Sequence, residues 1–323
     1  MMPFRALLFV LTLAAGAFGL PAAAQLPGAT SLPGAASSVV TTPRVRAELL
    51  AYAPDGVTPG APGWLGLQIT HQPHWHTSWK NPGDSGLPTA LAWTLPQGLS
   101  AGDIAWPTPR KIPIGTLTNF GYEDTLLLPV PVTVAPDFKP AGLLPGSSTV
   151  ELRLHASWLV CKEECIPEEG QFALKLPVQG STATSKAAFD AALAAGPTQL
   201  AAASQATVDG NTLRLRVDDL PAAAHGKTLE FFPETPEVLR NNAKVNVDWT
   251  QDWDGTTWTA TLPLDPQRSA SPDALPFVLA LADAGAATGA TGGTPAWRTE
   301  AAVSGNWPAA PPGATVSPAL SGG

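Results

Sequence analysis

The fold is indicated most clearly by the stretch Val150-Glu-Leu-Arg-Leu-His-Ala-Ser157, in which apolar and polar side chains alternate. Successive side chains of a β-strand point to opposite faces of its sheet, so this pattern predicts a strand with one buried and one wet face. The stretch Gly63-Trp-Leu-Gly-Leu-Gln-Ile-Thr70 alternates in the same way. Alternation over several residues is typical of antiparallel sheets, whose two faces lie in different surroundings.

Short runs of the same kind, bounded by Pro and Gly, recur along the whole chain. In the first half they cover residues 45–51, 63–71, 90–95, 126–134, 149–158 and 170–176. In the second half they cover residues 212–217, 228–232, 244–249, 256–262, 277–282 and 296–303, with Asp254-Gly255 as a tight hairpin turn. Many short strands with frequent turns predict antiparallel sandwiches, so we expect an all-β protein with two β-sandwich domains.

The N-terminus has the features of a cleavable signal peptide over residues 1–24. Arg5 supplies a positive charge, residues 6–20 are apolar, and Ala22-Ala23-Ala24 fits the small-residue cleavage rule. The apolar run is short for a bilayer, which argues against an uncleaved membrane anchor. We therefore expect the chain to be exported.

The remaining boundaries follow from shifts in composition. Residues 25–43 carry no charge and are rich in Ala, Gly and Pro, which predicts a flexible lead-in to a first domain over residues 44–180. Residues 181–204 form a linker that contains the best helical segment, residues 186–195. A second domain is expected over residues 205–305, followed by a disordered tail over residues 306–323.

Length and charge exclude some functions. The chain has 323 residues, enough for two domains with a core each. Its 18 basic and 26 acidic residues leave a net charge of −8, which argues against nucleic-acid binding because phosphate contacts need a basic face. The 30 Gly and 35 Pro residues fit short strands joined by many turns.

The chemistry concentrates in the only two cysteines, Cys161 and Cys165. In an exported protein they are natural disulfide partners. A bridge across five residues restrains the unfolded chain by only about 2 kcal/mol, so stability is a weak reason for it and redox exchange a better one. Lys162 favours a thiolate but the neighbouring glutamates oppose it, which points to attack by a partner's thiolate rather than by this pair.

Two alternatives for the cysteines stay open. One is a purely structural disulfide in a non-catalytic secreted binding module, which could use the tryptophans of the second domain as a contact surface. The other is a periplasmic copper-binding protein, because His71, His74, His76 and His155 could add imidazole ligands to the thiolates. The Cys-x3-Cys spacing is not usual for structural zinc, so we predict no metal and no organic cofactor.

Three segments together resemble the exported N-terminal domain of the DsbD family of thiol:disulfide interchange proteins, especially the ScsB variant. They are Trp79-Lys-Asn-Pro-Gly-Asp-Ser-Gly86, Asn119-Phe-Gly-Tyr-Glu-Asp124 followed by Leu128-Pro129-Val130, and Trp158-Leu-Val-Cys-Lys-Glu-Glu-Cys-Ile-Pro167. Taken without the resemblance, the first segment predicts a tight surface loop and the second a loop with two aromatics.

The resemblance implies an immunoglobulin-like first domain in the periplasm, and we expect the second sandwich to share that fold class. It implies that Cys161 and Cys165 are the redox pair, with Cys165 forming the mixed disulfide, and that Phe120 and Tyr122 belong to a cap loop that shields the pair. The implied activity is that of a protein-disulfide reductase component. Its donor would be a thioredoxin-like domain or a membrane electron-transfer protein, and its acceptors would be periplasmic disulfide proteins.

Overall fold

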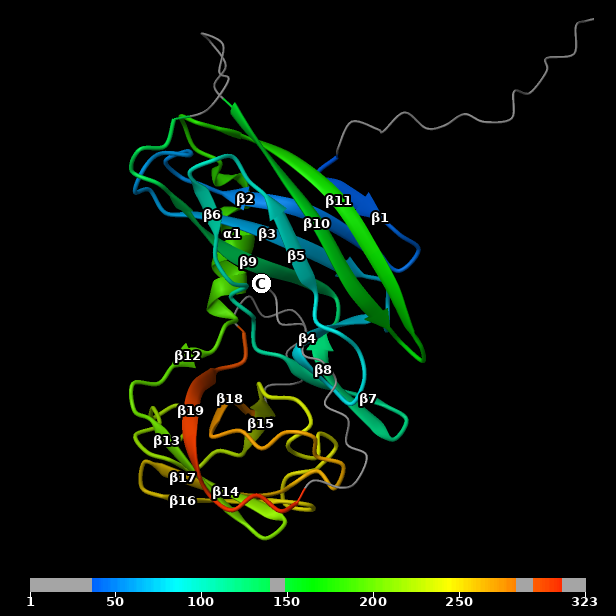
Figure 1. Ribbon diagram of the computed structural model, residues 1–323, viewed down its shortest axis with the longest axis vertical. Helices are drawn as coiled ribbons and strands as arrows, with labels where there is room; N and C mark the ends of the chain where they lie inside the picture. The colour runs from blue at the N-terminus through cyan, green and yellow to red at the C-terminus, as the bar shows by residue number, and fades with distance from the viewer. Residues whose placement is uncertain (1–36, 140–148, 283–292, 310–323) are drawn as a thin grey trace, which may run out of the picture. The chain divides into compact units, whose positions relative to one another are not determined.

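The computed structural model describes residues 37–139, 149–282 and 293–309 (Figure 1). The predicted signal peptide, most of the lead-in and residues 310–323 of the predicted tail lie outside the described residues. Among the described residues, no helix has the length and apolar content needed to cross a bilayer.

The first half of the chain is a sandwich of two antiparallel sheets (Figure 1). One sheet has the order β1 (Val39–Thr41), β2 (Val45–Tyr52), β3 (Gly63–His71), β9 (Thr125–Val134) and β6 (Leu99–Ala101). The other has the order β11 (Cys165–Pro177), β10 (Thr149–Cys161), β4 (His76–Gly83), β8 (Leu117–Tyr122) and β7 (Arg110–Ile114), with β5 (Ala90–Thr94) also paired to β10. The strands predicted from alternation are therefore confirmed.

Alternation decides which side chains fill the space between the two sheets. In β10 the buried residues include Leu154 and Trp158, and their neighbours in sequence are exposed or partly exposed. They pack against Leu49 of β2 and Leu67 of β3 in one cluster. Full burial of an aliphatic side chain stabilises a fold by about 1.5–3 kcal/mol, so a shift of one residue in register would remove most of this core.

The predicted linker helix exists as α1 (Lys186–Ala194), after a 3₁₀ turn η1 (Ala183–Ser185), and it packs on the first sandwich. Phe189 is fully buried, and its ring centroid lies 6.1 Å from that of Tyr52. Gly66 makes room for it, because a Cβ there would lie 3.1 Å from the Phe189 Cε1 and 2.8 Å from the Leu127 Cδ1. The segment is therefore attached to the first sandwich along one face of the helix.

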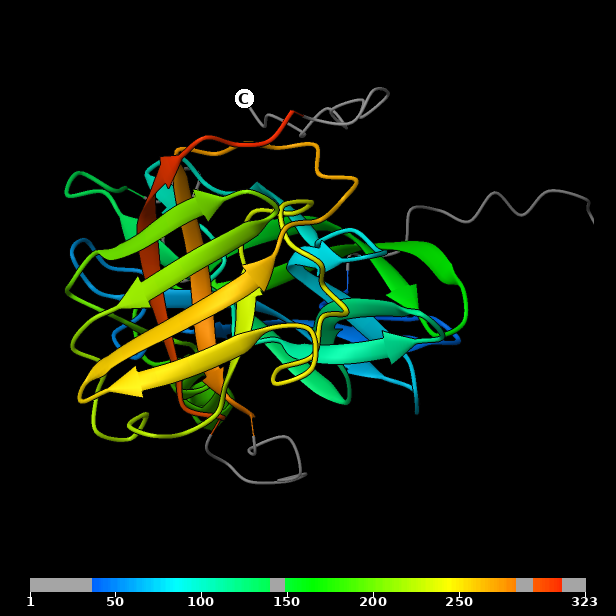
Figure 2. The same ribbon diagram turned by 90° about the horizontal axis from the view of Figure 1, so that it is seen from below.

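The second half of the chain forms one hydrogen-bonded sheet of eight strands. Its order is β15 (Leu229–Pro233), β18 (Ala274–Leu281), β19 (Ala296–Gly305), β13 (Ser204–Asp209), β14 (Thr212–Val217), β17 (Thr257–Pro263) and β16 (Thr250–Asp254), with β12 (Thr198–Gln199) beside β19. The parallel pair β13–β19 joins the two halves of this sheet. The green and yellow strands lie across the orange and red strands in Figure 2, and a single core fills the space between them.

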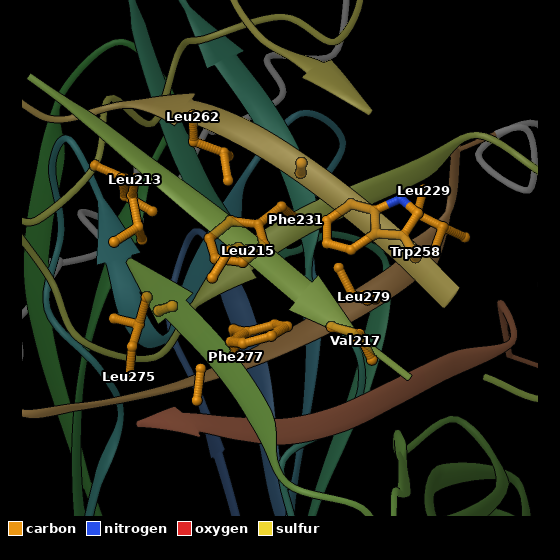
Figure 3. Packing of buried hydrophobic residues seen from close by; sticks show 14 of the residues in the cluster. Leu213, Leu215, Val217, Leu229, Phe231, Trp258, Leu262, Leu275, Phe277 and Leu279 are labelled. Carbon is orange, nitrogen blue, oxygen red and sulfur yellow. The ribbon is translucent and has the colours of Figure 1, made fainter. Parts of the chain in front are cut away.

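That core consists of aliphatic and aromatic side chains from strands on both sides of it. Leu215 of β14 and Trp258 of β17 pack in the same cluster as Phe231 of β15 and Phe277 of β18 (Figure 3). The buried tryptophans of this half are Trp249, Trp258 and Trp297. These three serve packing, whereas Trp253 and Trp307 are only partly buried.

One predicted strand is wrong. Residues 244–249 alternate in sequence, but they form a turn in which the Lys244 N–H donates to the Asp248 carboxylate at 2.9 Å. Asn246 adopts a φ of 61°, which interrupts an extended backbone. Of the apolar residues in this segment, Val247 is 77% exposed and Trp249 is buried, so the alternation does not describe one face of a sheet.

The segment Trp79–Gly86 was predicted as a surface loop. Its first five residues instead belong to strand β4, and they contact the second sandwich. Trp79 is 1% exposed because it packs with Phe120 around Phe232, whose ring centroid lies 6.3 Å and 5.3 Å from theirs. Asn81 donates from Nδ2 to the Pro233 carbonyl at 2.7 Å. The prediction was wrong because the residues that bury this strand, Phe232 and Pro233, lie in a distant part of the sequence.

Charged groups reinforce this contact between the sandwiches. Lys80 Nζ lies 3.2 Å from Glu234 Oε2, and Arg298 Nε donates to Glu234 Oε1 at 2.7 Å. Burial disfavours a charge on Glu234, but the hydrogen bond from Arg298 and the charge of Lys80 outweigh it and lower the pKa of that carboxyl. Glu234 thus stays ionised at neutral pH, where it binds both cations.

Candidate redox site

The two cysteines lie at the tip of the long β10–β11 hairpin. The antiparallel register pairs Cys161 directly with Cys165, and the two form a disulfide with a Cα–Cα distance of 4.0 Å. The turn between them is closed by a hydrogen bond from the Lys162 N–H to the Glu164 carbonyl at 3.0 Å. The ladder of the hairpin continues from this tip to the pair Thr149–Pro177, so backbone pairing along the whole hairpin holds the two strands together in addition to the disulfide.

The two cysteines differ in exposure. Cys161 is 1% exposed, whereas Cys165 is half-buried and follows an exposed turn. Thiol–disulfide exchange proceeds by attack of a thiolate on one sulfur and depends on access to it. Cys165 is therefore the cysteine whose sulfur an external thiolate would reach more readily.

A histidine lies beside the buried cysteine. His76 of β4 is the direct cross-strand partner of Cys161 and is also 1% exposed. Its Nε2 accepts a hydrogen bond at 3.1 Å from Asn119 Nδ2. The Asn119 Oδ1 in turn accepts from the Ser85 N–H at 3.1 Å and from the Ser85 hydroxyl at 2.8 Å. Burial, with a smaller contribution from the charge of His71, lowers the pKa of His76 to about 4.

The sequence drew attention to His76 only as a metal-ligand candidate beside His74. Its proximity to Cys161 could not be found, because residues 76–78 were assigned to no strand, residues 79–86 were predicted as a surface loop, and the pairing of this segment with β10 was unknown.

The other histidines do not join the cysteines. His71 donates from Nδ1 to the Asp124 carbonyl at 2.8 Å and accepts at Nε2 from the Thr77 hydroxyl at 3.1 Å. His74 is exposed in a turn with a φ of 69°. His155 precedes Cys161 by six residues of extended strand, which amounts to about 20 Å. Within the described part of the chain, no group of three His, Cys, Asp or Glu side chains could hold a metal ion.

The two aromatics of the expected cap loop lie in a strand, β8, so the loop prediction is wrong. Thr77 pairs with both Val160 and Tyr122, which puts these three on one face of the sheet and Cys161 on the other. Phe120 packs against the second sandwich, and the Tyr122 hydroxyl donates to a backbone carbonyl at 2.7 Å. Shielding of the disulfide by these rings stays a prediction, and the strand register does not favour it.

The glycine between these aromatics has a clear role. A Cβ on Gly121 would lie 2.3 Å from the Thr77 carbonyl oxygen, so only glycine allows β8 to approach β4 this closely. The approach brings Asn119 within reach of His76. Burial raises the pKa of Tyr122 on the opposite face, which keeps that hydroxyl neutral.

Comparison with known proteins identifies the first sandwich. Residues 47–177 match the family described as thiol:disulfide interchange protein DsbD, N-terminal. This sandwich belongs to the DsbD N-terminal domain family. It is accordingly a thiol–disulfide interchange domain, and it carries its disulfide at the hairpin tip described above.

Solved structures extend the likeness beyond the DsbD N-terminal domain. The crystal structure of the N-terminal periplasmic domain of ScsB from Proteus mirabilis aligns with 82% of this chain and 98% of that chain, with a TM-score of 0.53 and 16% identity. This similarity shows that the two proteins share a fold, and the aligned region is longer than the segment of residues 47–177. A chimeric titin Z1Z2 aligns with 82% of this chain and 100% of the titin chain at 10% identity, but the TM-score of 0.17 is too low to indicate a shared fold. No curated protein matches the chain.

We expect the buried histidines of the DsbD N-terminal domain to make the fold acid-sensitive. An unfolded histidine has a pKa of 6.5, whereas folded His76 has a pKa of about 4. Between these values the unfolded chain binds the additional proton, so the free energy of unfolding falls as the pH drops from about 6.5 to about 4. The protonation of His76 in the unfolded chain lowers the free energy of unfolding by at most about 3 kcal/mol. Burial also lowers the pKa of His71, which adds a loss of the same sign.

The measurement is urea denaturation at pH 7 and pH 4.5 for the natural chain and for His76→Phe. The variant lacks the titrating group, so its difference between the two pH values should be smaller than that of the natural chain. An equal pH dependence in both proteins would show that groups other than His76, with His71 and Glu234 among them, cause the acid sensitivity.

Proposed function

We propose that the chain is a periplasmic protein-disulfide reductase component that relays electrons through Cys161 and Cys165. The donor is a thioredoxin-like domain or a membrane electron-transfer protein, and the acceptors are periplasmic disulfide proteins. The observation that carries the proposal is the disulfide at the hairpin tip, where one cysteine is buried and the other is accessible. Membership of the first sandwich in the DsbD N-terminal family supports it.

Reduction takes place in two exchange steps. A thiolate of the donor attacks the Cys165 sulfur, a new bond forms between the two proteins, and the Cys161–Cys165 bond breaks with its electron pair on Cys161. The second thiol of the donor, as a thiolate, then attacks the donor sulfur of the mixed disulfide and releases Cys165. The donor leaves as a disulfide, two electrons have moved, and the two protons of the donor thiols balance those taken up by the cysteines.

The exposed residues of the turn support a passive role in the first step. Glu163 and Glu164 are exposed next to Cys165, and their charges disfavour a thiolate there. The pair is therefore better suited to accept an attack than to start one. The periplasm, where the predicted signal peptide would deliver the chain, is the compartment in which such a disulfide forms and needs a source of electrons.

The proposal is tested by the reduction potential of the pair, measured by equilibration with reduced and oxidised glutathione and read by thiol alkylation. Structural disulfides of secreted proteins have potentials below about −300 mV, whereas labile catalytic ones are more oxidising. We expect a value above that limit and full reduction by a stoichiometric amount of reduced thioredoxin. A potential below the limit, with no reduction by thioredoxin, would identify the bond as structural and reject the proposal.

A further inference from the structure

Burial of Cys161 poses a problem for the exchange reaction. When a donor attacks Cys165, the electron pair of the broken bond remains on Cys161, which is 1% exposed. An apolar environment disfavours a thiolate, and exchange slows as the pKa of the leaving thiol rises. The first step therefore needs a hydrogen-bond donor next to the Cys161 sulfur.

His76 is placed to be that donor. Side chains of directly paired residues in an antiparallel ladder lie on the same face, with Cβ atoms about 4.5–5.5 Å apart, and Cys161 pairs with His76. Both residues are 1% exposed, so bulk water does not compete for the sulfur. A hydrogen bond to a charged group in such surroundings is stronger than one to a neutral group.

The hydrogen bonds around Asn119 determine where the His76 proton lies. The Ser85 N–H can only donate, so the Asn119 atom that it contacts at 3.1 Å is the amide oxygen. The amide nitrogen of Asn119 must then face His76 and donate to Nε2. A ring nitrogen that accepts carries no proton, so the neutral imidazole holds its proton on Nδ1. The Nδ1–H remains as the one donor of the ring.

We propose that His76 stabilises the Cys161 thiolate during exchange through its Nδ1–H, and that Asn119 is the positioning residue that holds the ring in this tautomer. This inference rests on the proposed function, since it assigns Cys161 as the leaving group. The bond forms as the Cys161–Cys165 bond breaks, and it is absent from the disulfide state because a disulfide sulfur carries no charge.

The groups around His76 favour this role. From β10 it faces Cys161 and from β8 the neutral amide of Asn119, and a charge on His71 would lower its pKa further. His71 is tied to Asp124 and Thr77 and is neutral at pH 7, because burial lowers its pKa. The new charge on Cys161 is thus the one close anion among these partners, and the thiol and the imidazole titrate as a coupled pair after reduction.

The test compares His76→Phe with two matched variants. His71→Phe makes the same change at the neighbouring buried histidine, and His76→Gln restores a donor at position 76. The apparent pKa of Cys161 is read from thiolate absorbance at 240 nm in a Cys165→Ser background. The rate of disulfide reduction by dithiothreitol at pH 7 is measured in the two-cysteine proteins, with far-UV circular dichroism as the check on folding.

We expect His76→Phe to raise the Cys161 pKa by at least one unit and to slow reduction about tenfold or more. His76→Gln should recover part of the rate, and His71→Phe should stay within about twofold of the natural chain. A folded His76→Phe protein with an unchanged Cys161 pKa and rate would overturn the inference. If His76→Phe does not fold, Asn119→Ala replaces it, and the same two readouts should change in the same direction by a smaller factor.

The two proposals fail in different ways. If reduced thioredoxin does not reduce the natural chain, the proposed function is wrong, and the Cys161 pKa in the Cys165→Ser background still decides the role of His76. If thioredoxin reduces the natural chain and the His76→Phe protein equally fast, with equal Cys161 pKa values, the role of His76 is wrong and the function stands.

Discussion

Replacing either Cys161 or Cys165 by Ser is expected to abolish reduction by a thioredoxin-like donor and to leave the far-UV circular dichroism spectrum almost unchanged. The chemistry is lost entirely because exchange needs both sulfurs. The fold persists because β10 and β11 are paired along their whole length down to Thr149 and Pro177. The bond itself closes only five residues and contributes about 2 kcal/mol. Glu163→Gln, in the same turn, is the control that should keep full reduction.

The two serine variants should also differ from each other. Cys161→Ser leaves the half-buried Cys165 thiol, whereas Cys165→Ser leaves the Cys161 thiol, which is 1% exposed. Access to the sulfur limits exchange, so the first variant should react with Ellman's reagent at least about ten times faster. It should also form a stable mixed disulfide with a thioredoxin-like partner. The opposite order would assign the accessible role to Cys161, and loss of the fold in both variants would support a structural disulfide.

Phe232→Ala is expected to lower the free energy of unfolding by about 3–5 kcal/mol, the range for truncation of a buried phenylalanine. Phe232 is 3% exposed, and its ring touches both Trp79 and Phe120 in edge-to-face contacts. These two aromatics lie on strands of the first sandwich, so the truncation opens a cavity between the two halves of the chain. Urea denaturation followed by tryptophan fluorescence measures the loss.

The control for this prediction is Leu117→Ala at the β7–β8 turn, where the side chain is 43% exposed. Substitution at an exposed position away from packed features changes stability by about 0.5 kcal/mol or less. If Phe232→Ala cost no more than Leu117→Ala, the contact between the sandwiches would contribute nothing to stability. Two separate unfolding transitions in the natural chain would lead to the same conclusion.

Much of the fold could be predicted from local patterns. Residues 63–71 and 212–217 were predicted as strands with the bounds of β3 and β14, and the helix at residues 186–195 is α1 within one residue. These elements have a strict periodicity, because one face packs on a core and the other meets water. The hairpin turn at Asp254-Gly255 follows from the ease with which Gly255 adopts a φ of 60°.

The elements that were missed are buried on both faces. β4 carries Trp79 on one face, covered by Phe232, and His76 on the other, next to Asn119. A strand covered on both sides shows no alternation, and the Asn-Pro and Gly-Asp-Ser-Gly residues within and after β4 are typical of turns. Its pattern therefore predicted a loop, and the same reasoning applies to the aromatics of β8.

The sequence by itself determined the all-β class and the disulfide, because the two cysteines lie four residues apart and each has no other cysteine partner in the chain. Only the tertiary structure decided which cysteine is buried and that His76 lies opposite Cys161. The reason is that cross-strand neighbours are set by hydrogen-bond register between segments far apart in the chain, and register depends on the core of the whole sandwich. The environment of the sulfurs is a property of that packing.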